Sequence, residues 1–306
     1  MDTLPKIIVA VCTYRRNDPL RTLLSALVDV AAAARERAQV GVVVVDDNPD
    51  QRARAVVSDF DQAFALGIRY RTSGKGNISL ARNIAVDTAS QDADWVAMVD
   101  DDCEPEPTWL CAYLDVLQAT GADCATGPMN LRVPEGSPKW LQEQPFFDDV
   151  RFDFEDGAPM NVAATNNSII KAAFLRDHPD LRFLPELGKL GGEDMVFYRS
   201  ARAAGLQIRF AKNAGVWGNE PPDRATFKHQ VKYRFWLGNS MFVTGSHFGA
   251  SRPRLFLRGG KLLSLALLRP LARIARFTSP QLRYCVASSA CGVGLMTGAL
   301  GFKKEH

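Results

Sequence analysis

The stretch Asp94-Trp95-Val96-Ala97-Met98-Val99-Asp100-Asp101-Asp102 is a short apolar run that ends in three consecutive carboxylates. Such a run between polar residues predicts a buried β-strand, whose last residues emerge at the edge of a sheet. Adjacent carboxylates repel one another unless a positive charge lies between them. Mg²⁺ and Mn²⁺ prefer oxygen ligands, and Mg²⁺ is often shared with substrate phosphates. The stretch therefore predicts a metal that holds a diphosphate. The alternative is a solvated acidic turn before a helix near Pro107, where acids suit the helix dipole.

The composition is that of a globular protein. The chain has 306 residues, enough for one large α/β domain or for a domain with an appendage. It is 46% hydrophobic and 23% charged, which gives no sign of disorder. The net charge of only +3 provides no global field that would favour nucleic acid. The charge is uneven, however, because the segment from Arg252 to Arg283 has eight Arg or Lys residues and no Asp or Glu.

The cysteines and the amino terminus both indicate a cytoplasmic protein. The chain has no CxxC spacing and no histidine close to a cysteine, which argues against zinc. We expect reduced, mostly buried thiols. The amino terminus leads into a predicted strand without the pattern of a signal peptide. The six cysteines are Cys12, Cys103, Cys111, Cys124, Cys285 and Cys291.

The first third of the chain alternates predicted strands with predicted helices. Strands are expected over 6–14, 41–48, 68–71 and 95–99, and helices over 20–37, 53–66 and 78–89. The first two strands deliver polar residues to the same end of a parallel sheet, which is where ligands bind in open α/β sheets. The loop around Lys75 is too short for a P-loop, and no GxGxxG motif occurs. A nucleotide would therefore be held by strand-end side chains.

The middle of the chain contains a long irregular region. A helix over 109–120 and a strand beginning within 122–128 precede it, and another strand is expected over 163–170. Residues 129–159 are rich in proline and aromatic residues, and long loops in compact domains are usually functional or mobile. We interpret this region as an acceptor-side loop, with plain surface irregularity as the alternative. Its aromatic residues are Trp140, Phe146, Phe147, Phe152 and Phe154.

A glycine-rich approach leads to the acid pair Glu193-Asp194 at the start of a predicted helix over 195–204. Acids in the first turn of a helix are favoured by the helix dipole, which is the structural interpretation. The functional interpretation is a catalytic base, delivered by a loop that glycine lets come close to a ligand. The residues alone leave both open.

Five motifs, in this order and at this spacing, resemble the nucleotide-sugar glycosyltransferases of family 2. The similarity covers about residues 6 to 245. Each motif is weak alone, and the five in order are strong together. They are Val9-Ala10-Val11-Cys12-Thr13-Tyr14, Val44-Val45-Asp46-Asp47-Asn48, Ala81-Arg82-Asn83, Asp100-Asp101-Asp102 with Pro107 following, and Gly192-Glu193-Asp194.

The resemblance implies an α/β fold of the GT-A type, with a Rossmann-like mixed sheet flanked by helices over residues 1–250. A helical extension would follow over 251–306. It also implies an inverting hexosyltransferase that uses Mn²⁺ or Mg²⁺. The donor would be a nucleotide diphosphate sugar, with a UDP-sugar expected first, and the acceptor a carbohydrate or a lipid-linked molecule. A looser resemblance of residues 216–238 to enzymes that build bacterial surface polysaccharides such as succinoglycan indicates polysaccharide or glycoconjugate biosynthesis.

The resemblance also assigns roles to individual residues. Asp102 would be the metal ligand of the DxD element, with Asp101 close to the ribose. Asp194 would be the general base, with Glu193 beside it for orientation or acceptor binding. Asp47 would bind the base of the nucleotide. The full set expected to bind the nucleotide sugar is Thr13, Tyr14, Arg16, Asp46, Asp47, Lys75, Arg82, Asp100 and Asp101.

Inverting transfer needs residues of these types. A carboxylate within hydrogen-bond reach of the acceptor hydroxyl acts as general base, worth roughly 10²–10⁴-fold. A divalent cation stabilises the negative charge that grows on the leaving diphosphate. No protein nucleophile is required. Two other classes compete with this interpretation: a non-catalytic nucleotide-sugar-binding scaffold and a nucleotidyltransferase. The latter would show a glycine-rich basic loop after the first strand, and Thr13-Tyr14-Arg15-Arg16 is not such a loop.

The carboxyl-terminal segment combines leucine with positive charge. Residues 255–277 have the pattern of a basic amphipathic helix, which can lie in the interface of an anionic membrane. Residues 284–302 carry no charge, and the segment is almost long enough to span a bilayer. Its many small residues favour a helix that packs on the protein or dips into the membrane. We expect a cytoplasmic protein that is peripheral on the inner face of the cell membrane. The alternative is two ordinary helices that cover the domain or form a dimer contact.

Overall fold

The computed structural model describes residues 4–147 and 154–302, which form two compact units. Unit 1 comprises Met1–Asn130, Val150–Gly188 and Phe197–Gly218. Unit 2 comprises Leu131–Asp149, Lys189–Val196 and Asn219–His306. The division at residue 250 that the sequence suggested stays a prediction. Phe152, one of the aromatic residues of the irregular region, lies outside the described residues.

Unit 1 is built around a mixed sheet with the strand order β3-β2-β1-β4-β9-β6-β10-β8. β1 pairs in parallel with β2 and β4, and β2 pairs in parallel with β3. β9 is antiparallel to both β4 and β6. The strands are β1 Lys6–Thr13, β2 Gln39–Asp46, β3 Ile68–Thr72, β4 Trp95–Val99, β6 Cys124–Thr126, β8 Pro159–Met160, β9 Asn167–Lys171 and β10 Ile208–Phe210. A smaller sheet has the order β5-β11-β7, with β5 Cys103–Pro105, β11 Val216–Asn219 and β7 Met129–Arg132.

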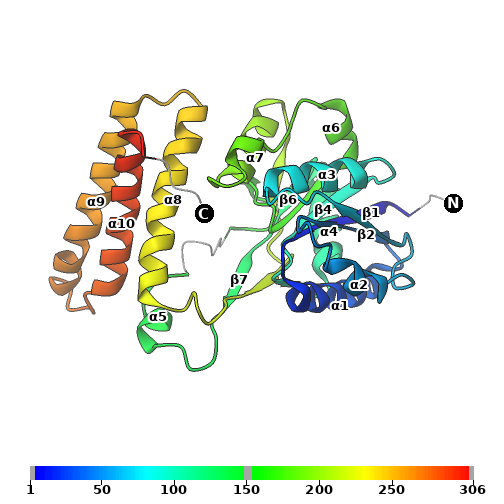
Figure 1. Ribbon diagram of the computed structural model, residues 1–306, viewed down its shortest axis with the longest axis horizontal. Coiled ribbons are helices and arrows are strands. Elements are labelled where there is room, and N and C mark those ends of the chain that lie inside the picture. The colour runs from blue at the N-terminus through cyan, green and yellow to red at the C-terminus, as the bar shows by residue number, and fades with distance from the viewer. Residues whose placement is uncertain (1–3, 148–153, 303–306) are drawn as a thin grey trace. The chain divides into compact units, whose positions relative to one another are not determined.

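Helices cover both faces of the large sheet (Figure 1). α1 Asn17–Ala34, α2 Ala53–Ser58 and α4 Trp109–Thr120 share one face. α3 Ile78–Ser90, α6 Ala172–Asp177 and the part of α7 Glu193–Ala203 that belongs to unit 1 share the other. Side chains alternate along a strand, so Ile7 and Val9 of β1 enter the core with α1, while Ile8 and Ala10 enter the core with α3. A strand buried on both faces explains the unbroken apolar run in its sequence.

Asn167, the first residue of β9, connects several elements of unit 1. Its Oδ1 accepts hydrogen bonds from Trp109 Nε1 (2.8 Å) and from the Tyr113 hydroxyl, both on α4. Its Nδ2 donates to the carbonyl oxygens of Pro128 and Ala214, both at 2.9 Å. The side chain is fully buried, and these bonds satisfy both ends of its amide. Asn167 therefore fixes α4 against two loops of the unit.

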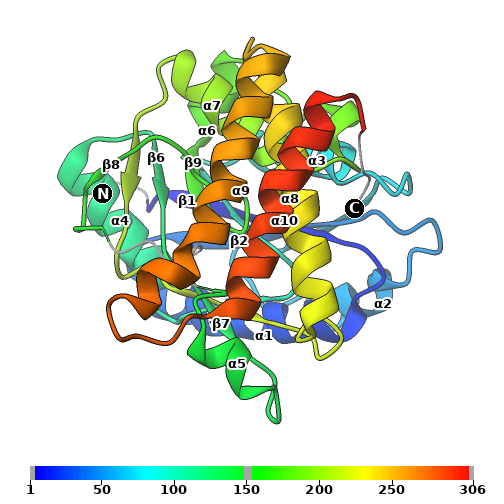
Figure 2. The same cartoon turned by 90° about the vertical axis from the view of Figure 1, so that its left-hand side faces the viewer.

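Unit 2 contains α5 Lys139–Glu143 and three long helices, α8 Phe227–His247, α9 Arg252–Ile274 and α10 Leu282–Ala299. α10 lies between α8 and α9 (Figures 1 and 2). Small residues allow close packing, since a Cβ at Gly294 would lie 2.0 Å from the carbonyl oxygen of Phe235. The expected carboxyl-terminal helices are thus confirmed. Among the described residues, no helix is long and apolar enough to cross a bilayer.

Several boundaries differ from those the sequence indicated. The helix expected over 53–66 ends at Ser58, and the strand expected over 163–170 begins only at Asn167. The irregular region contains β7 and α5. Two of its aromatic residues, Trp140 and Phe146, form edge contacts within unit 2, with ring centroids 5.1 Å apart for Trp140 and Phe146 and 5.5 Å for Phe146 and Tyr284. These contacts give Trp140 and Phe146 a structural role, while an acceptor-side role for the loop stays a prediction.

Candidate active site

The polar residues that follow β1, β2 and β4 meet at the carboxyl edge of the sheet. The strands are parallel and in register, with Thr13 of β1 opposite Asp46 of β2. The backbone N–H of Asp47 donates to the carbonyl oxygen of Thr13 at 2.9 Å, so the two loops begin side by side. The predicted convergence of strand-end residues is confirmed. Ligands bind at this edge in open α/β sheets.

Two arginines of unit 1 face the acid triplet. Arg16, just before α1, has its Nη1 atom 3.0 Å from Asp101 Oδ1 and 2.6 Å from Asp102 Oδ2. Arg82 on α3 has its Nη2 atom 3.4 Å from Asp100 Oδ1. The sequence indicated that something positive must offset these three carboxylates, and in this structure the guanidinium groups do so. Each acid therefore has an arginine partner.

Asp101 is the most deeply buried acid of the triplet. Its Oδ2 accepts a hydrogen bond of 2.7 Å from the Thr13 hydroxyl. Burial raises the pKa of Asp101 to about 6, although the Arg16 charge and the Thr13 hydrogen bond act in the opposite direction. Desolvation outweighs the attraction because the carboxyl is almost inaccessible to water. The Asp101 carboxyl thus links the end of β1 to the loop after β4.

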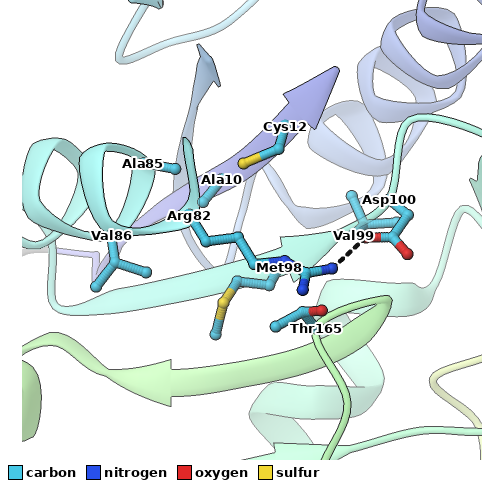
Figure 3. Close-up of a pocket in the computed structure, with 9 residues that line it drawn as sticks. All are labelled: Ala10, Cys12, Arg82, Ala85, Val86, Met98, Val99, Asp100 and Thr165. Carbon is cyan, nitrogen blue, oxygen red and sulfur yellow. Dashed lines mark hydrogen bonds and ion pairs between the residues drawn. The ribbon is translucent and has the colours of Figure 1, made fainter. Parts of the chain in front are cut away.

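A small pocket opens beside Arg82 and Asp100 (Figure 3). Cys12 of β1 and Thr165 line it together with these two residues. The rest of its wall is apolar, formed by Ala10, Ala85, Val86, Met98 and Val99. Burial raises the pKa of the Cys12 thiol to about 12, so the thiol stays protonated at neutral pH. The pocket therefore combines an apolar floor with one guanidinium, one carboxylate and one hydroxyl.

The two acids after β2 have different surroundings. Asp46 is buried and accepts hydrogen bonds at both oxygens, from the N–H groups of Asn48 and Ala53 and from the Tyr70 hydroxyl. These contacts hold the loop between β2 and α2 and give Asp46 a structural role, while nucleotide binding by Asp46 stays a prediction. Asp47 Oδ1 accepts hydrogen bonds from the Ser73 hydroxyl and the Lys75 N–H. Asp47 therefore orders the glycine-containing loop that carries Lys75.

Tyr14 is an exposed residue of the group. Its side chain is 44% accessible and follows directly after β1. The guanidinium of Arg15 lies over its ring, with Arg15 Cζ 5.1 Å from the ring centroid. An accessible ring at the carboxyl edge of a sheet suits stacking against a planar base. The structure thus brings the residues expected to bind the donor, from Thr13 to Asp102, onto one edge of unit 1.

The acid pair Glu193-Asp194 belongs to unit 2 and is described with it. The two residues open α7, as the sequence predicted for a first turn, and Asp194 Oδ1 accepts from the Met195 N–H at 2.6 Å. Gly191 and Gly192 have φ values of +81° and +87°, which L side chains rarely adopt. A Cβ at Gly191 would lie 2.1 Å from the Trp236 ring of α8. The glycines thus bring this loop close to α8, while the approach of the loop to a ligand stays a prediction.

The donor groups at the acid triplet fit a hard divalent cation. Among the described residues, no group of three or more His, Cys, Asp or Glu residues could hold a metal ion. Mg²⁺, however, is usually bound through one or two carboxylates, with the rest of its ligands from water and substrate phosphates. Asp102 offers a partly accessible carboxylate for this purpose. The site is suited to an ion that arrives with a diphosphate.

Sequence reasoning missed two parts of this site. Thr165 lines the pocket, and Tyr70 braces Asp46 from β3. Thr165 precedes Asn166 and Asn167, the second of which begins β9, and a polar run before a buried strand was a usable signal. Tyr70 gave no such signal, because a tyrosine in a strand is ordinary.

The fold and the strand-end acids define an α/β protein with a candidate ligand site at the carboxyl edge of its sheet. The model of the family described as glycosyl transferase family 2 matches residues 8–178, and the chain belongs to this family. A relative, the succinoglycan biosynthesis protein ExoM of Rhizobium meliloti (strain 1021), is 31% identical over 241 residues. The alignment covers 76% of this chain and 72% of ExoM.

Solved glycosyltransferases share the fold. Residues 1–349 of S. aureus TarS superimpose with a TM-score of 0.55 at 17% identity, covering 93% of this chain and 91% of that chain. The same protein in complex with UDP-GlcNAc gives a TM-score of 0.54 at 16% identity, with the same coverage. GalNAc-T7 with UDP, GalNAc and Mn²⁺ gives 0.55 at 13% identity, covering 79% of this chain and 51% of that one. These similarities confirm the predicted GT-A type fold, a mixed sheet flanked by helices with a helical carboxyl-terminal region.

Proposed function

We propose that this glycosyltransferase moves a hexosyl group from a UDP-sugar to an acceptor hydroxyl, with inversion and with Mn²⁺ or Mg²⁺ bound. One observation carries the proposal: Thr13, Arg16 and the acids Asp100 to Asp102 converge at the carboxyl edge of the sheet. The neighbours support the donor class, since TarS was solved with UDP-GlcNAc and GalNAc-T7 with UDP and Mn²⁺.

In the donor half of the reaction, the residues of unit 1 hold the nucleotide and its phosphates. Asp47 and Tyr14 bind the base and Asp101 the ribose, while Asp102 holds the cation. The cation, when bound, neutralises the charge that grows on the leaving diphosphate. Arg16, Lys75 and Arg82 supply positive charge for the phosphates, and a guanidinium fork matches phosphate oxygens well.

In the acceptor half, Asp194 removes the proton from the acceptor hydroxyl as this hydroxyl attacks the anomeric carbon. The bond to the diphosphate breaks on the opposite side, so the sugar is transferred with inversion and without a protein nucleophile. Glu193 orients Asp194 or the acceptor. Both carboxylates lie in the first turn of α7.

The acceptor is proposed to be a carbohydrate or a lipid-linked glycan in polysaccharide biosynthesis. The support is the 31% identity to a succinoglycan biosynthesis protein. Such an acceptor agrees with a cytoplasmic enzyme that is peripheral on the inner face of the cell membrane. The domain limits 1–250 and 251–306 belong to this proposal.

Thermal-shift titration tests the donor half. The 306-residue chain is titrated with UDP, dTDP and GDP, each with and without Mn²⁺. UDP with Mn²⁺ should raise the midpoint most, because a ligand at about 100 times its Kd adds roughly 2.7 kcal/mol to the free energy of unfolding. Asp102→Ala should abolish the dependence on Mn²⁺.

Asp59→Ala is the matched control for this titration, since Asp59 is an accessible acid whose ion pair with Arg21 lies on the surface. It should keep the full response to UDP and Mn²⁺. An Asp102→Ala protein that still responds to Mn²⁺ would remove Asp102 from the metal site. A wild-type protein that binds none of the three nucleotides would overturn the proposed donor.

A further inference from the structure

The outward face of α9 in unit 2 carries a row of accessible leucines. Leu257 is 72% accessible and Leu271 is 64% accessible, and Leu268 is also exposed. These three residues lie 11 and 3 positions apart, a spacing that places them on one face of the helix. Large apolar side chains that share a solvent-facing surface usually mark an interaction site.

The opposite face of α9 is already used inside the unit. Leu255, Gly259 and Ala266 are buried, and they lie 4 and 7 positions apart on one face. A Cβ at Gly259 would lie 2.6 Å from Met296 Cγ on α10, so α9 packs closely there. The leucines of the outward face therefore do not contribute to this packing.

Positive charge accompanies the exposed leucines. Between Arg224 and Lys304 the chain has no Asp or Glu, while the segment from Arg252 to Arg283, both included, has eight Arg or Lys residues. Helical spacing sets Arg254, Arg258 and Lys261 along one side of the leucine row, and all three are exposed. We call Leu257, Leu268, Leu271 and these three cations the α9 surface.

The turn after α9 presents a fully accessible aromatic ring. Phe277 is 100% exposed and has a φ of +55°, which a bulky side chain seldom adopts. Its N–H donates to the Ile274 carbonyl at 2.9 Å, and the Thr278 N–H donates to the Arg273 carbonyl at 3.0 Å. Arg273 Nε also donates to the Ser279 carbonyl oxygen. The turn is thus held by hydrogen bonds while its aromatic side chain points into solvent.

We propose that the α9 surface and Phe277 bind an anionic lipid bilayer, with α9 lying in the interface between headgroups and acyl chains. Leucines and an aromatic ring enter the apolar layer, and the flanking cations bind lipid phosphates. A second copy of the chain fits less well, because self-association would bring two uniformly cationic surfaces together. Nucleic acid would use the cations but leave the leucines in water. This interaction does not depend on the proposed sugar transfer.

Vesicle co-sedimentation of the 306-residue chain tests the proposal, without any donor present. The protein should bind vesicles of phosphatidylglycerol with phosphatidylcholine, bind phosphatidylcholine alone weakly, and dissociate as salt rises. Leu268→Gln with Leu271→Gln should weaken binding roughly tenfold or more, because two leucines lose their apolar contacts. Arg258→Gln with Lys261→Gln should weaken it by about fivefold per charge. Phe277→Ser should also weaken it.

The controls are Leu4→Gln for the leucines and Arg35→Gln for the cations, because both residues are exposed and lie in unit 1. Both should bind vesicles like the wild type, and all variants should keep the circular dichroism of the folded protein. Three results would overturn the proposal. One is an absence of binding to anionic vesicles. Another is vesicle binding that survives the leucine substitutions, together with equally tight binding of the protein to duplex RNA. The third is a protein that binds no vesicles and forms a dimer in light scattering, with the leucine substitutions dissociating this dimer.

Discussion

At the scale of single residues, the charge balance at the acid triplet depends on Arg16. Its guanidinium contacts Asp101 and Asp102, the same carboxylates that we assign to the ribose and the cation. The pairing raises the pKa of Arg16, although burial acts in the opposite direction. A bound cation would offset the same negative charge. If the cation binds as proposed, Arg16 and the cation would compete for these acids, and Arg16 would be free to bind phosphate once the cation is present.

Arg16→Ala should separate these two roles. Without metal, we expect the free energy of unfolding to fall by about 2 kcal/mol, because two carboxylates lose their charged partner. Mn²⁺ should bind the free protein roughly tenfold more tightly, since it no longer displaces a guanidinium. UDP should bind more weakly. Isothermal titration measures both affinities, with Arg21→Ala as the control for a surface arginine. Unchanged Mn²⁺ affinity in Arg16→Ala would contradict the competition.

Asp101 should give the metal-free protein a specific pH dependence. Burial raises its pKa to about 6, above the value near 3.9 of an unfolded chain. At a pH between these two pKa values, the folded state therefore holds a proton that the unfolded state has lost. The contribution of this group to the free energy of unfolding falls as the pH rises through the pKa of the folded state. Between about pH 5 and pH 7.5 the loss should be about 1 kcal/mol.

The measurement is chemical denaturation in EDTA at both pH values, for the wild type and for Asp101→Asn. The variant has no titrating group at this position, so it should gain about 1 kcal/mol relative to the wild type as pH rises. Parallel pH profiles for the two proteins would show that Asp101 has no raised pKa.

The residue types of the site were predictable, and their partners were not. Strand-end acids can be found from sequence because an apolar run that stops at Asp100 marks the edge of a sheet. The pairing of Arg16 with Asp101 joins residues 85 positions apart, and no local pattern encodes it. The same holds for Tyr70, which reaches Asp46 only because β2 and β3 are neighbours.

At the scale of elements, β9 and α4 depend on one buried amide. Asn167→Ala would leave the indole N–H of Trp109 and the hydroxyl of Tyr113 without their acceptor, in a core where water cannot replace it. We expect a loss of about 3 to 5 kcal/mol in the free energy of unfolding. Denaturant titration measures it, and the neighbouring Asn166→Ala is the control. Asn166 is only partly buried, so its substitution should cost less than about 1 kcal/mol. Equal losses would refute the role of Asn167.

The helices of unit 2 depend on glycine where they cross. Gly294→Ala on α10 would place a methyl group 2.0 Å from the Phe235 carbonyl oxygen of α8. Backbone must move to accommodate it, and we expect a cost of about 2 to 3 kcal/mol. Gly260→Ala on α9 is the matched control, because its Cβ would meet nothing within 4 Å. That change should stabilise the protein by about 0.5 to 1 kcal/mol through helix propensity alone. Thermal denaturation followed by circular dichroism measures both, and a harmless Gly294→Ala would contradict the close packing of α8 and α10.

Elements with a strong pattern were predicted well, and weakly patterned elements were not. α4 has the predicted bounds because Gly121, with a φ of +67°, ends a clear apolar periodicity. The helix expected over 53–66 stops at Ser58, since the residues that follow form turns between α2 and β3. β9 starts at Asn167 because tertiary hydrogen bonds begin there, which strand propensity does not report.

At the scale of the whole molecule, the sequence indicated the family and the fold but not the composition of unit 2. This unit combines residues 131–149 and 189–196 with the carboxyl-terminal helices. Contacts between distant positions build it: Arg234 Nη2 donates to the Phe146 carbonyl at 3.2 Å, and the Tyr284 N–H donates to Gln144 Oε1 at 2.8 Å. Local periodicity predicts each helix but gives no information about such long-range contacts.

The proposed reaction assigns donor binding to residues of unit 1 and proton removal to Asp194 in unit 2, so substitutions should separate the two steps. Asp194→Asn keeps the size of the side chain but removes its basicity, and sugar transfer should fall by roughly 10²-fold or more. Stabilisation by UDP with Mn²⁺ should stay at the wild-type level, because the base acts on the acceptor.

Transfer is measured as UDP released in the presence of an acceptor fraction, and donor binding as the shift of the thermal midpoint. Asp223→Asn removes another accessible acid of unit 2 and should leave both quantities unchanged. If Asp194→Asn kept full turnover, the base would have to be another residue. If the variant lost donor binding together with transfer, Asp194 would belong to the donor site, and the division of the reaction between donor and acceptor residues would be wrong.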